Sequence, residues 1–361
     1  MIWVVEELAG FGGIEHMVAL HAAEMARAGV PITLVARPPI HPVWRTRLKD
    51  AGLRLVEADD ESPAALCRCT LRVAHEAAAR AILFVPLGEG CEHWLHLGER
   101  PPIWTTAWEM TDMSARCWWL PERLSEWIHR LDMLLVVSDS ARREAVERFG
   151  FRAPVRVVPG GVYAPNPGVS PRAPDSSPLV TCISRLSQEK GLEYAIAALA
   201  LLPRSLDGVR LDVWGDGIDR TRLLTQLRLF GVEDCVSLQG TFAPGDQLDD
   251  IASRTTVFLL PSLIEGRPIA LMEMAVRGVP TVATETTGAV EILGADYPWL
   301  VPVGDTHALA SALRDLLVQP DSWCRAVEWV LRASRPFVVT AGRSSPVLEC
   351  HRHLYGMEVA R

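Results

Sequence analysis

The stretch GGVYAPNPGVSPRAPDSSP at 160–178 divides the sequence into two parts. It holds five prolines and three glycines in 19 residues, and such a composition can continue neither a helix nor a central strand. We therefore predict a domain boundary, with a first domain over 1–165, a linker over 166–178 and a second domain over 179–335. The tail at 336–361 is irregular and then helical, and we expect its helix to return to the first domain. A long surface loop within one domain is the alternative.

Short apolar runs alternate with amphipathic stretches on both sides of this linker. One helical pattern is IEHMVALHAAEMARAG at 14–29, where apolar residues recur at helical spacing and a glycine ends the run. Strands that are apolar throughout and alternate with helices are typical of parallel sheets covered on both faces. We therefore predict an α/β protein of two facing, Rossmann-like, doubly wound domains, with a ligand cleft between them at the carboxyl ends of the strands. The expected strands lie at 2–6, 32–36, 53–56, 81–85, 103–107, 133–137 and 155–158, and then at 179–184, 209–215, 235–240, 256–261, 280–284 and 299–303.

The charge balance and the composition exclude several classes of protein. Across 361 residues, 36 Lys and Arg stand against 44 Asp and Glu, and this net charge of -8 argues against a nucleic-acid partner. The apolar runs are too short for a membrane span, and the start MIWVVEELAG has no signal-peptide features. The eight cysteines include no CxxC pair, so we expect reduced thiols and a cytoplasmic protein. Only Lys49 and Lys190 are lysines, which draws attention to both positions.

Two loops that follow predicted strands carry residues suited to phosphate. GFGG at 10–13 would let backbone N–H groups at a helix start approach an anion, with a simple tight turn as the alternative. SRLSQEKG at 184–191 places Arg185 and Lys190 in one turn, and an Arg fork with a Lys charge suits a diphosphate. Two solvated surface cations are the alternative there. GDGIDR at 215–220 is a weaker candidate of the same kind.

The most specific motif is PSLIEGRPIALMEMAVRGVP at 261–280. Pro268 suits the first position of a helix that Gly278 and Pro280 would close. Glu265 would lie in the preceding loop and Glu273 within the helix. A carboxylate beside exposed backbone N–H groups can hold sugar hydroxyls while those N–H groups bind phosphate. A capped helix with one surface glutamate is the alternative.

Four of these segments resemble, in the same order, motifs of the retaining glycosyltransferases of family 4, which have the GT-B fold. GFGGIE resembles the first-loop G-G-x-E, and VVPGGV at 157–162 resembles V-I-P-N-G-V before the linker. SRLSQEKGL resembles G-R-L-x-x-x-K-G, and EGRPIALME matches the Glu–seven residues–Glu motif. The resemblance covers most of the chain and is strongest from 135 to 305.

The resemblance implies transfer of a hexose from a nucleoside diphosphate-sugar, UDP before GDP, without a metal or another cofactor. Arg185 and Lys190 would bind the diphosphate and stabilise it as it leaves. Glu265 would contact hydroxyls of the transferred sugar, and Glu273 would hold the ribose hydroxyls.

The first domain and the donor loop would supply further donor-site residues. Gly12 and Gly13 would approach the phosphates, so that catalysis needs a closed cleft. Trp108 and Glu109 stand where many family members carry a histidine close to the donor sugar. Arg267 is an extra cation that could read an acidic donor or acceptor, with a solvated surface arginine as the alternative. The rest of the donor-binding set that the resemblance implies is Gly215, Phe242, Gly266, Pro268 and Ile269.

The acceptor is expected to bind the first domain and to be a soluble glycan or natural product, because no basic amphipathic helix of the membrane-binding kind is evident there. Six tryptophans could form an acceptor wall, with core packing as the alternative. A catalytically degenerate, sugar-nucleotide-binding partner subunit is the alternative function, motivated by the missing histidine. The absence of GxGxxG disfavours an oxidoreductase. The six tryptophans are Trp94, Trp104, Trp108, Trp118, Trp119 and Trp127.

Overall fold

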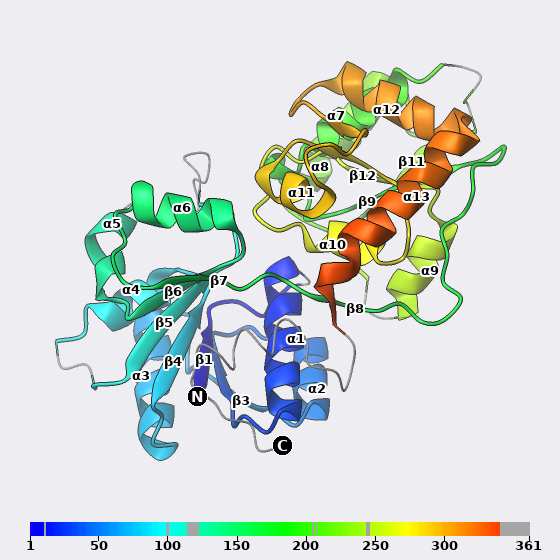
Figure 1. Cartoon of the computed structure of the whole chain (residues 1–361). Helices are drawn as coiled ribbons and strands as arrows, with labels where there is room; N and C mark the ends of the chain where they lie inside the picture. Colours follow the sequence, from blue (N-terminus) through cyan, green and yellow to red (C-terminus); the bar gives the residue numbers. More distant parts are fainter. Residues whose placement is uncertain are drawn as a thin grey trace. The chain divides into compact units, whose positions relative to one another are not determined.

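The computed structural model describes residues 1–10, 12–98, 101–113, 123–203, 206, 208–242 and 246–339. The chain divides into two compact units, Met1–Gly161 and Val162–Ala341. Each unit is built on a parallel sheet with helices packed against it (Figure 1). The helix expected at the C-terminus falls beyond residue 339 and so lies outside the described residues.

The first unit contains a parallel sheet in the order β3-β2-β1-β4-β5-β6-β7. Ile2 at the start of β1 pairs with Thr33 of β2 on one side and with Ile82 of β4 on the other. The chain therefore leaves β1 in one direction and later returns to its other side, which is the order of a doubly wound fold. The strands are β1 (Ile2–Val5), β2 (Thr33–Ala36), β3 (Arg54–Glu57), β4 (Ala81–Val85), β5 (Trp104–Glu109), β6 (Met133–Val136) and β7 (Val155–Val157).

Two helices of the first unit, α3 and α6, begin at serine caps. Ser62 accepts a hydrogen bond from the N–H of Ala65, and Ser138 accepts one from that of Ala141, each at a helix start. Helices lie on both sides of the sheet, with α1 and α2 on one side and α3 on the other (Figure 1). The helices are α1 (Gly13–Arg27), α2 (Pro42–Asp50), α3 (Pro63–Glu76), α4 (Glu89–Leu95), α5 (Leu124–Trp127) and α6 (Asp139–Glu147), with the 3-10 helix η1 (Ile128–Arg130) after α5.

The second unit repeats this plan with a parallel sheet in the order β11-β10-β9-β12-β13-β14. Its first strand in sequence, β9, pairs with β10 on one side and with β12 on the other. The strand order therefore reverses between β9 and β12. The strands are β9 (Leu179–Ile183), β10 (Arg210–Trp214), β11 (Val236–Gly240), β12 (Val257–Leu260), β13 (Thr281–Thr284) and β14 (Leu300–Val301).

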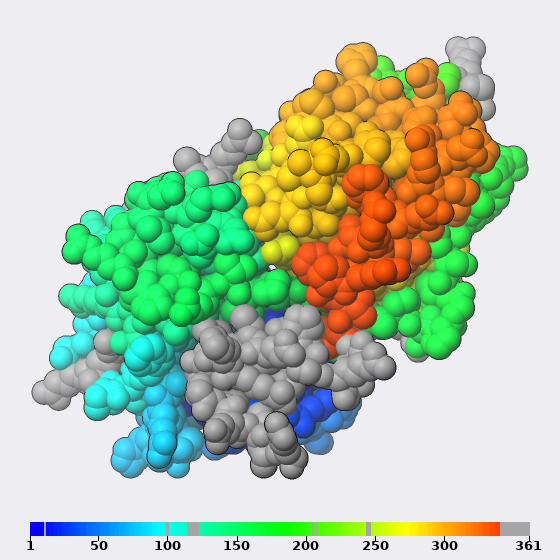
Figure 2. All heavy atoms as spheres, in the orientation of Figure 1, coloured from blue at the N-terminus to red at the C-terminus, as the bar shows by residue number. Residues whose placement is uncertain are grey.

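The helices of the second unit cover this sheet. Figure 2 shows α12 and α13 as orange and red atoms on the outer surface of the unit. Asp305 caps α12 by accepting a hydrogen bond from the N–H of Ala308 at 2.9 Å. The helices are α7 (Leu192–Ala200), α8 (Arg220–Phe230), α9 (Asp246–Arg254), α10 (Ile269–Ala275), α11 (Thr287–Leu293), α12 (Thr306–Val318) and α13 (Pro320–Ser334), with the 3-10 helices η2 (Gln188–Lys190) and η4 (Arg335–Phe337).

The proline-rich stretch packs on the second unit. A two-stranded parallel sheet joins β8 (Val162–Tyr163) to β15 (Val338–Val339) directly after the boundary. The N–H of Asn166 donates to Asp249 Oδ2 at 3.0 Å, and the N–H of Arg172 donates to the carbonyl of Thr255 at 3.0 Å. The boundary at 161/162 therefore lies ahead of the linker expected at 166–178, because these contacts hold that linker to the second unit.

The predicted fold class is confirmed. All thirteen predicted strands are present within one or two residues, and both sheets are wholly parallel. The strands β8 and β15, which have two residues each, were not predicted. None of the helices in the described part of the chain combines the length and the apolar character of a transmembrane segment.

Candidate functional site

The candidate site lies in the second unit, where the strand order reverses between β9 and β12. In open parallel sheets, ligands bind outside the carboxyl ends of the strands at such a point. The turn at 184–191 follows β9, and the loop at 261–268 follows β12. The topology therefore brings the two most specific sequence motifs to adjacent strand ends.

Gly191 holds this turn against the loop after β12. Its φ of +59° is left-handed, and a Cβ atom there would lie 2.2 Å from the carbonyl oxygen of Pro261. Glycine is the residue that tolerates both conditions. A second link comes from the N–H of Leu263, which donates to the carbonyl of Glu189 at 2.8 Å.

Lys190 and Glu265 meet at this junction. Lys190 Nζ lies 2.9 Å from Glu265 Oε1, and the two side chains are only 15% and 10% exposed. Ser262 Oγ donates a hydrogen bond to the same Glu265 oxygen at 2.8 Å. Lys190 and Glu265 were predicted to belong to one site, but Ser262 was not, because its only signal is its position three residues before Glu265.

Arg185 presents its charge at the surface of the same turn. Its side chain is 69% exposed, and its Nη2 lies 3.3 Å from Glu189 Oε1. Ser187 Oγ donates to that glutamate oxygen at 2.5 Å. The guanidinium is therefore open to solvent, on the same turn as Lys190.

Gly215 supports the Arg185 turn from the end of β10. Its φ is +130°, and a Cβ atom there would lie 1.8 Å from the carbonyl oxygen of Ser184. The N–H of Leu186 also donates to the carbonyl of Asp216 at 2.9 Å. The backbone of the glycine turn at 215–217 thus packs directly against the backbone of the Arg185 turn. Gly215 is needed there for this close packing.

Phe242 packs against Trp214, the last residue of β10. The ring centroids are 5.9 Å apart and the rings are perpendicular. Phe242 follows β11, the neighbour of β10, by two residues. The pair forms a half-buried aromatic edge at the carboxyl ends of these two strands.

The loop that carries Glu265 is fixed by α11. The N–H of Gly288 donates to the carbonyl of Glu265 at 2.9 Å, and a Cβ at Gly288 would lie 2.7 Å from the carbonyl oxygen of Gly266. Pro268 is the N-cap of α10 and Ile269 its first residue, so the helix starts one residue later than expected. Gly288 was missed by the sequence analysis, because a glycine after a strand gives no sign of what it packs against.

Arg267 is not a solvated surface arginine, which was the alternative to a role in reading an acidic ligand. Its side chain is 6% exposed, and its Nη2 lies 3.3 Å from Glu291 Oε2. The guanidinium also lies over the ring of Phe337, 5.4 Å from the centroid. Burial lowers the pKa of Arg267. The ion pair with Glu291 and the contact with the ring of Phe337 therefore stabilise the Arg267 cation within the second unit.

Glu273 lies inside α10 and is almost fully buried. Arg277 Nη1 donates to its carbonyl oxygen at 2.8 Å, which fixes the last turn of the helix. The short helix α10 therefore joins Glu273 rigidly to the loop that carries Glu265.

The glycine loop of the first unit faces a carboxylate of the protein itself. Gly12 is the N-cap of α1 and Gly13 its first residue. A Cβ atom at Gly12 would lie 2.5 Å from Glu15 Oε2. A negative side chain in the first turn complements the positive end of a helix. Glu15 therefore occupies the space next to Gly12 that a phosphate would share.

Trp108 and Glu109, which were expected close to the donor sugar, are both buried within the first unit. Trp108 is fully buried and packs on His21, with ring centroids 4.5 Å apart. Glu109 is 1% exposed and accepts hydrogen bonds from the N–H of Leu87 at 3.2 Å and from that of Thr111 at 2.9 Å. Burial raises the pKa of Glu109. Both side chains are enclosed because each face of a parallel sheet is covered by helices.

The other tryptophans form no acceptor wall among the described residues. Trp94 and Trp127 are buried, and Trp94 packs on Phe84 with ring centroids 5.9 Å apart. Trp104 is 46% exposed but is the first residue of β5, at the opposite end from its carboxyl terminus. The tryptophans at 118 and 119 lie outside the described residues.

Glu6 was missed by the sequence analysis and lies at the reversal point of the first sheet, directly after β1. Its Oε1 accepts a hydrogen bond from the N–H of Gly90 at 2.7 Å, and its Oε2 accepts one from Arg37 at 3.1 Å. Burial raises the pKa of Glu6. The carboxylate ties the ends of β1, β2 and β4 together, and no motif in the sequence marked it.

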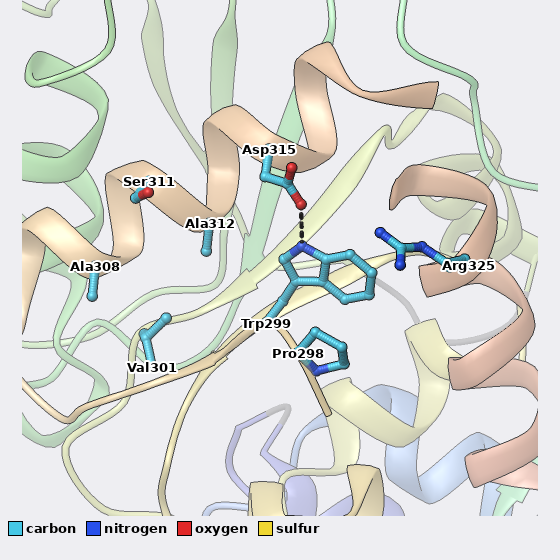
Figure 3. Close-up of a pocket in the computed structure, with 8 residues that line it drawn as sticks. All are labelled: Pro298, Trp299, Val301, Ala308, Ser311, Ala312, Asp315 and Arg325. Carbon is cyan, nitrogen blue, oxygen red and sulfur yellow. Dashed lines mark hydrogen bonds between the residues drawn. The ribbon is translucent and has the colours of Figure 1, made fainter. Parts of the chain in front are cut away.

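A cavity of about 360 Å³ lies elsewhere in the second unit (Figure 3). In it, Trp299 Nε1 donates a hydrogen bond to Asp315 Oδ2 at 2.8 Å. The lining shares no residue with the predicted donor-binding set. The cavity is lined by Pro298, Trp299, Val301, Ala308, Ser311, Ala312, Asp315 and Arg325.

In the described part of the chain, no three His, Cys, Asp or Glu side chains are grouped to hold a metal ion.

The second unit is similar in sequence to a family of known proteins. Residues 177–319 match the model of the family described as "Glycosyl transferases group 1". The amylovoran biosynthesis glycosyltransferase AmsK of Erwinia amylovora is 35% identical over 141 residues, which cover 37% of this chain and 34% of AmsK. The GDP-mannose-dependent alpha-(1-6)-phosphatidylinositol monomannoside mannosyltransferase of Mycobacterium tuberculosis is 29% identical over 223 residues, 55% of this chain and 57% of that protein. The matched regions thus span about one third to three fifths of these relatives.

The whole chain is similar in fold to a solved structure. HepE of Anabaena, in a complex with UDP-glucose, superposes with a TM-score of 0.79 at 17% identity, covering 99% of each chain. The chain therefore has the GT-B fold, and residues 177–319 of its second unit are similar to the group 1 glycosyl transferases.

Proposed function

We propose that this chain is a retaining, metal-independent glycosyltransferase of family 4. It transfers a hexose from a nucleoside diphosphate-sugar, UDP before GDP, to a hydroxyl of a soluble glycan or natural product in the cytoplasm. The observation that carries the proposal is the Lys190–Glu265 pair, 2.9 Å apart at the reversal point of the second sheet. A cation for phosphate and a carboxylate for sugar hydroxyls stand side by side where ligands of such sheets bind.

The chemistry follows from the charges. The bond between the anomeric carbon and the diphosphate oxygen breaks, and the diphosphate leaves with the electron pair. The acceptor oxygen forms the new bond to that carbon, and its proton passes to the leaving diphosphate. Arg185 and Lys190 stabilise the negative charge that develops on the diphosphate. Glu273 would hold the ribose, from the helix that begins after the Glu265 loop.

The named relatives support both nucleotides as candidates. HepE was solved with UDP-glucose, and the mycobacterial relative is named for GDP-mannose. We place UDP first, and the binding experiment uses both.

Binding of UDP and GDP by calorimetry tests the site. Loss of a charge-assisted contact costs roughly 1.5–3 kcal/mol, so Lys190→Ala and Glu273→Ala should each weaken the preferred nucleotide about 10- to 100-fold. Lys49→Ala is the matched control, since Lys49 lies on α2 of the first unit and is the only other lysine. If wild type binds neither nucleotide, or if neither variant weakens binding, the proposed site is wrong.

Trp108 is buried and stands in the place of the usual histidine. This observation favours a second candidate function, that of a catalytically degenerate partner subunit. A degenerate subunit would bind the sugar nucleotide and leave it intact. Slow release of free hexose from UDP-glucose or GDP-mannose by wild type, absent in Lys190→Ala, would establish catalysis. Binding without any hydrolysis or transfer would favour the partner subunit.

A further inference from the structure

The Glu265 carboxylate is held beside the ammonium group that would bind phosphate. Lys190 Nζ and Ser262 Oγ both contact Oε1 of Glu265, at 2.9 and 2.8 Å. Ser262 is itself fixed, because Thr284 Oγ1 donates to its carbonyl oxygen at 2.5 Å. The backbone of Glu265 is fixed as well, through its carbonyl and the N–H of Gly288. The negative charge therefore has little freedom to leave Lys190 when a ligand arrives.

A fixed carboxylate distinguishes two diphosphate ligands that differ only at their end. In a nucleoside diphosphate-sugar the terminal phosphate is esterified, and the sugar offers hydroxyl groups that can donate to a carboxylate. In the free nucleoside diphosphate that phosphate is a monoester, whose second proton dissociates with a pKa of about 6. At neutral pH the free nucleotide thus brings an extra negative charge toward Glu265. The phosphate and the carboxylate repel each other, and this repulsion is stronger in a partly buried site than in water.

We propose that Glu265 is a specificity residue that selects sugar-capped diphosphates over free nucleoside diphosphates. Beyond the hydroxyl contacts already proposed, it weakens binding of the free diphosphate product through charge repulsion, so that the spent nucleotide leaves. This inference rests on the proposed function, because it assumes that Lys190 binds the diphosphate.

Calorimetry with UDP and UDP-glucose, and with GDP and GDP-mannose if guanine is preferred, tests the selection. Glu265→Gln keeps the size of the side chain and removes the charge. The free diphosphate should bind this variant about tenfold more tightly than wild type, a change that lies between the repulsion of two unit charges about 4 Å apart in water and near a protein surface. The sugar-capped nucleotide should bind it no more tightly than wild type. Glu265→Asp keeps the charge and should bind the free diphosphate within about twofold of wild type.

The tighter binding of the free diphosphate by Glu265→Gln should also depend on pH and salt, in a way that a structural defect would not. It should shrink below pH 6, where the terminal phosphate takes up its second proton, and it should shrink in high salt. Glu233→Gln, at an exposed position in the same unit, controls for net charge. Thermal unfolding confirms that each variant is folded.

The outcomes separate this inference from the proposed function. If Lys190→Ala weakens the nucleotide but Glu265→Gln fails to tighten the free diphosphate, the selection by Glu265 is wrong and the site stands. Equal tightening of the free and sugar-capped nucleotides would also overturn it, because Glu265 would then repel any diphosphate. If Lys190→Ala changes neither ligand, the proposed function itself falls.

Discussion

Arg277 and Asp249 form a buried ion pair, with Arg277 Nε and Nη2 each 2.6 Å from Asp249 Oδ1. The pair joins three segments of the second unit. Arg277 also holds the carbonyl of Glu273 in α10, and Asp249 in α9 accepts the N–H of Asn166. The helix of the donor site and the proline-rich stretch after the boundary therefore share one charged anchor.

Removing one partner of this pair should destabilise the second unit strongly. Arg277→Met leaves Asp249 buried without its cation, and such a change typically costs about 3–5 kcal/mol. The double variant Arg277→Met, Asp249→Leu should recover much of this loss, because no buried charge remains. Urea unfolding measures both. Arg254→Met breaks an exposed pair with Asp250 on the same helix and should cost less than about 1 kcal/mol. Equal losses for Arg254→Met and Arg277→Met would contradict the burial argument.

The close approach at Gly191 should be separable from its backbone conformation. Gly191 and Gly231 have nearly the same φ, +59° and +64°, but only Gly191 faces a backbone atom within contact distance. Gly231→Ala should cost about 1–2 kcal/mol for the left-handed conformation. Gly191→Ala should cost more, because the turn must also move away from Pro261, and it should weaken nucleotide binding through Lys190. Urea unfolding and calorimetry of both variants test this, and equal effects would show that the contact with Pro261 is unimportant.

Trp108 should matter for the stability of the first unit and not for donor binding. Trp108→Ala empties a fully buried position and should cost about 3–5 kcal/mol. Trp104→Ala is the control on the same strand; at 46% exposure it should cost much less. Calorimetry should give both variants the wild-type affinity for UDP or GDP under conditions where they are folded. A selective loss of nucleotide affinity in Trp108→Ala would return this residue to the donor site.

Glu109 should make stability fall as the pH rises. Burial raises its pKa in the folded state above the ordinary value of 4.5, so between the two values the native chain binds more protons than the unfolded chain. The stabilisation is complete below 4.5 and is lost as the pH rises through the folded-state pKa. Urea unfolding at pH 5 and pH 8 should therefore show that the free energy of unfolding falls more between these two pH values in wild type than in Glu109→Gln. The exposed control Glu233→Gln should follow wild type, and identical slopes in all three proteins would rule out this role of Glu109.

The strands and their parallel pairing could be read from the sequence, because each is a short apolar run next to a helical pattern. The strands β8 and β15 could not, because two residues carry no periodicity and each needs a partner far away in the chain. The same limit applies to Ser262 and Gly288. Their roles come from contacts with Glu265 and the loop after it, and a serine or glycine after a strand has many uses.

Burial was the property that the sequence predicted least well. Arg267 is a cation and Trp108 follows a strand, so both suggested exposed, ligand-facing positions. In the structure Arg267 is enclosed with Glu291 and Phe337, and Trp108 is enclosed with His21. A charged side chain is expected at the surface unless a residue of opposite charge pairs with it in the interior. That residue comes from another helix or strand, so the local sequence does not reveal it.

By itself the sequence determined the two parallel-sheet units and the two loops that carry Lys190 and Glu265, because apolar periodicity and glycine positions are local properties. Only the tertiary structure decided that the ammonium group of Lys190 contacts the carboxylate of Glu265, 75 positions away in the sequence. That contact exists because β9 and β12 are neighbours at the point where the strand order reverses. Strand order depends on the packing of the whole sheet rather than on any one segment.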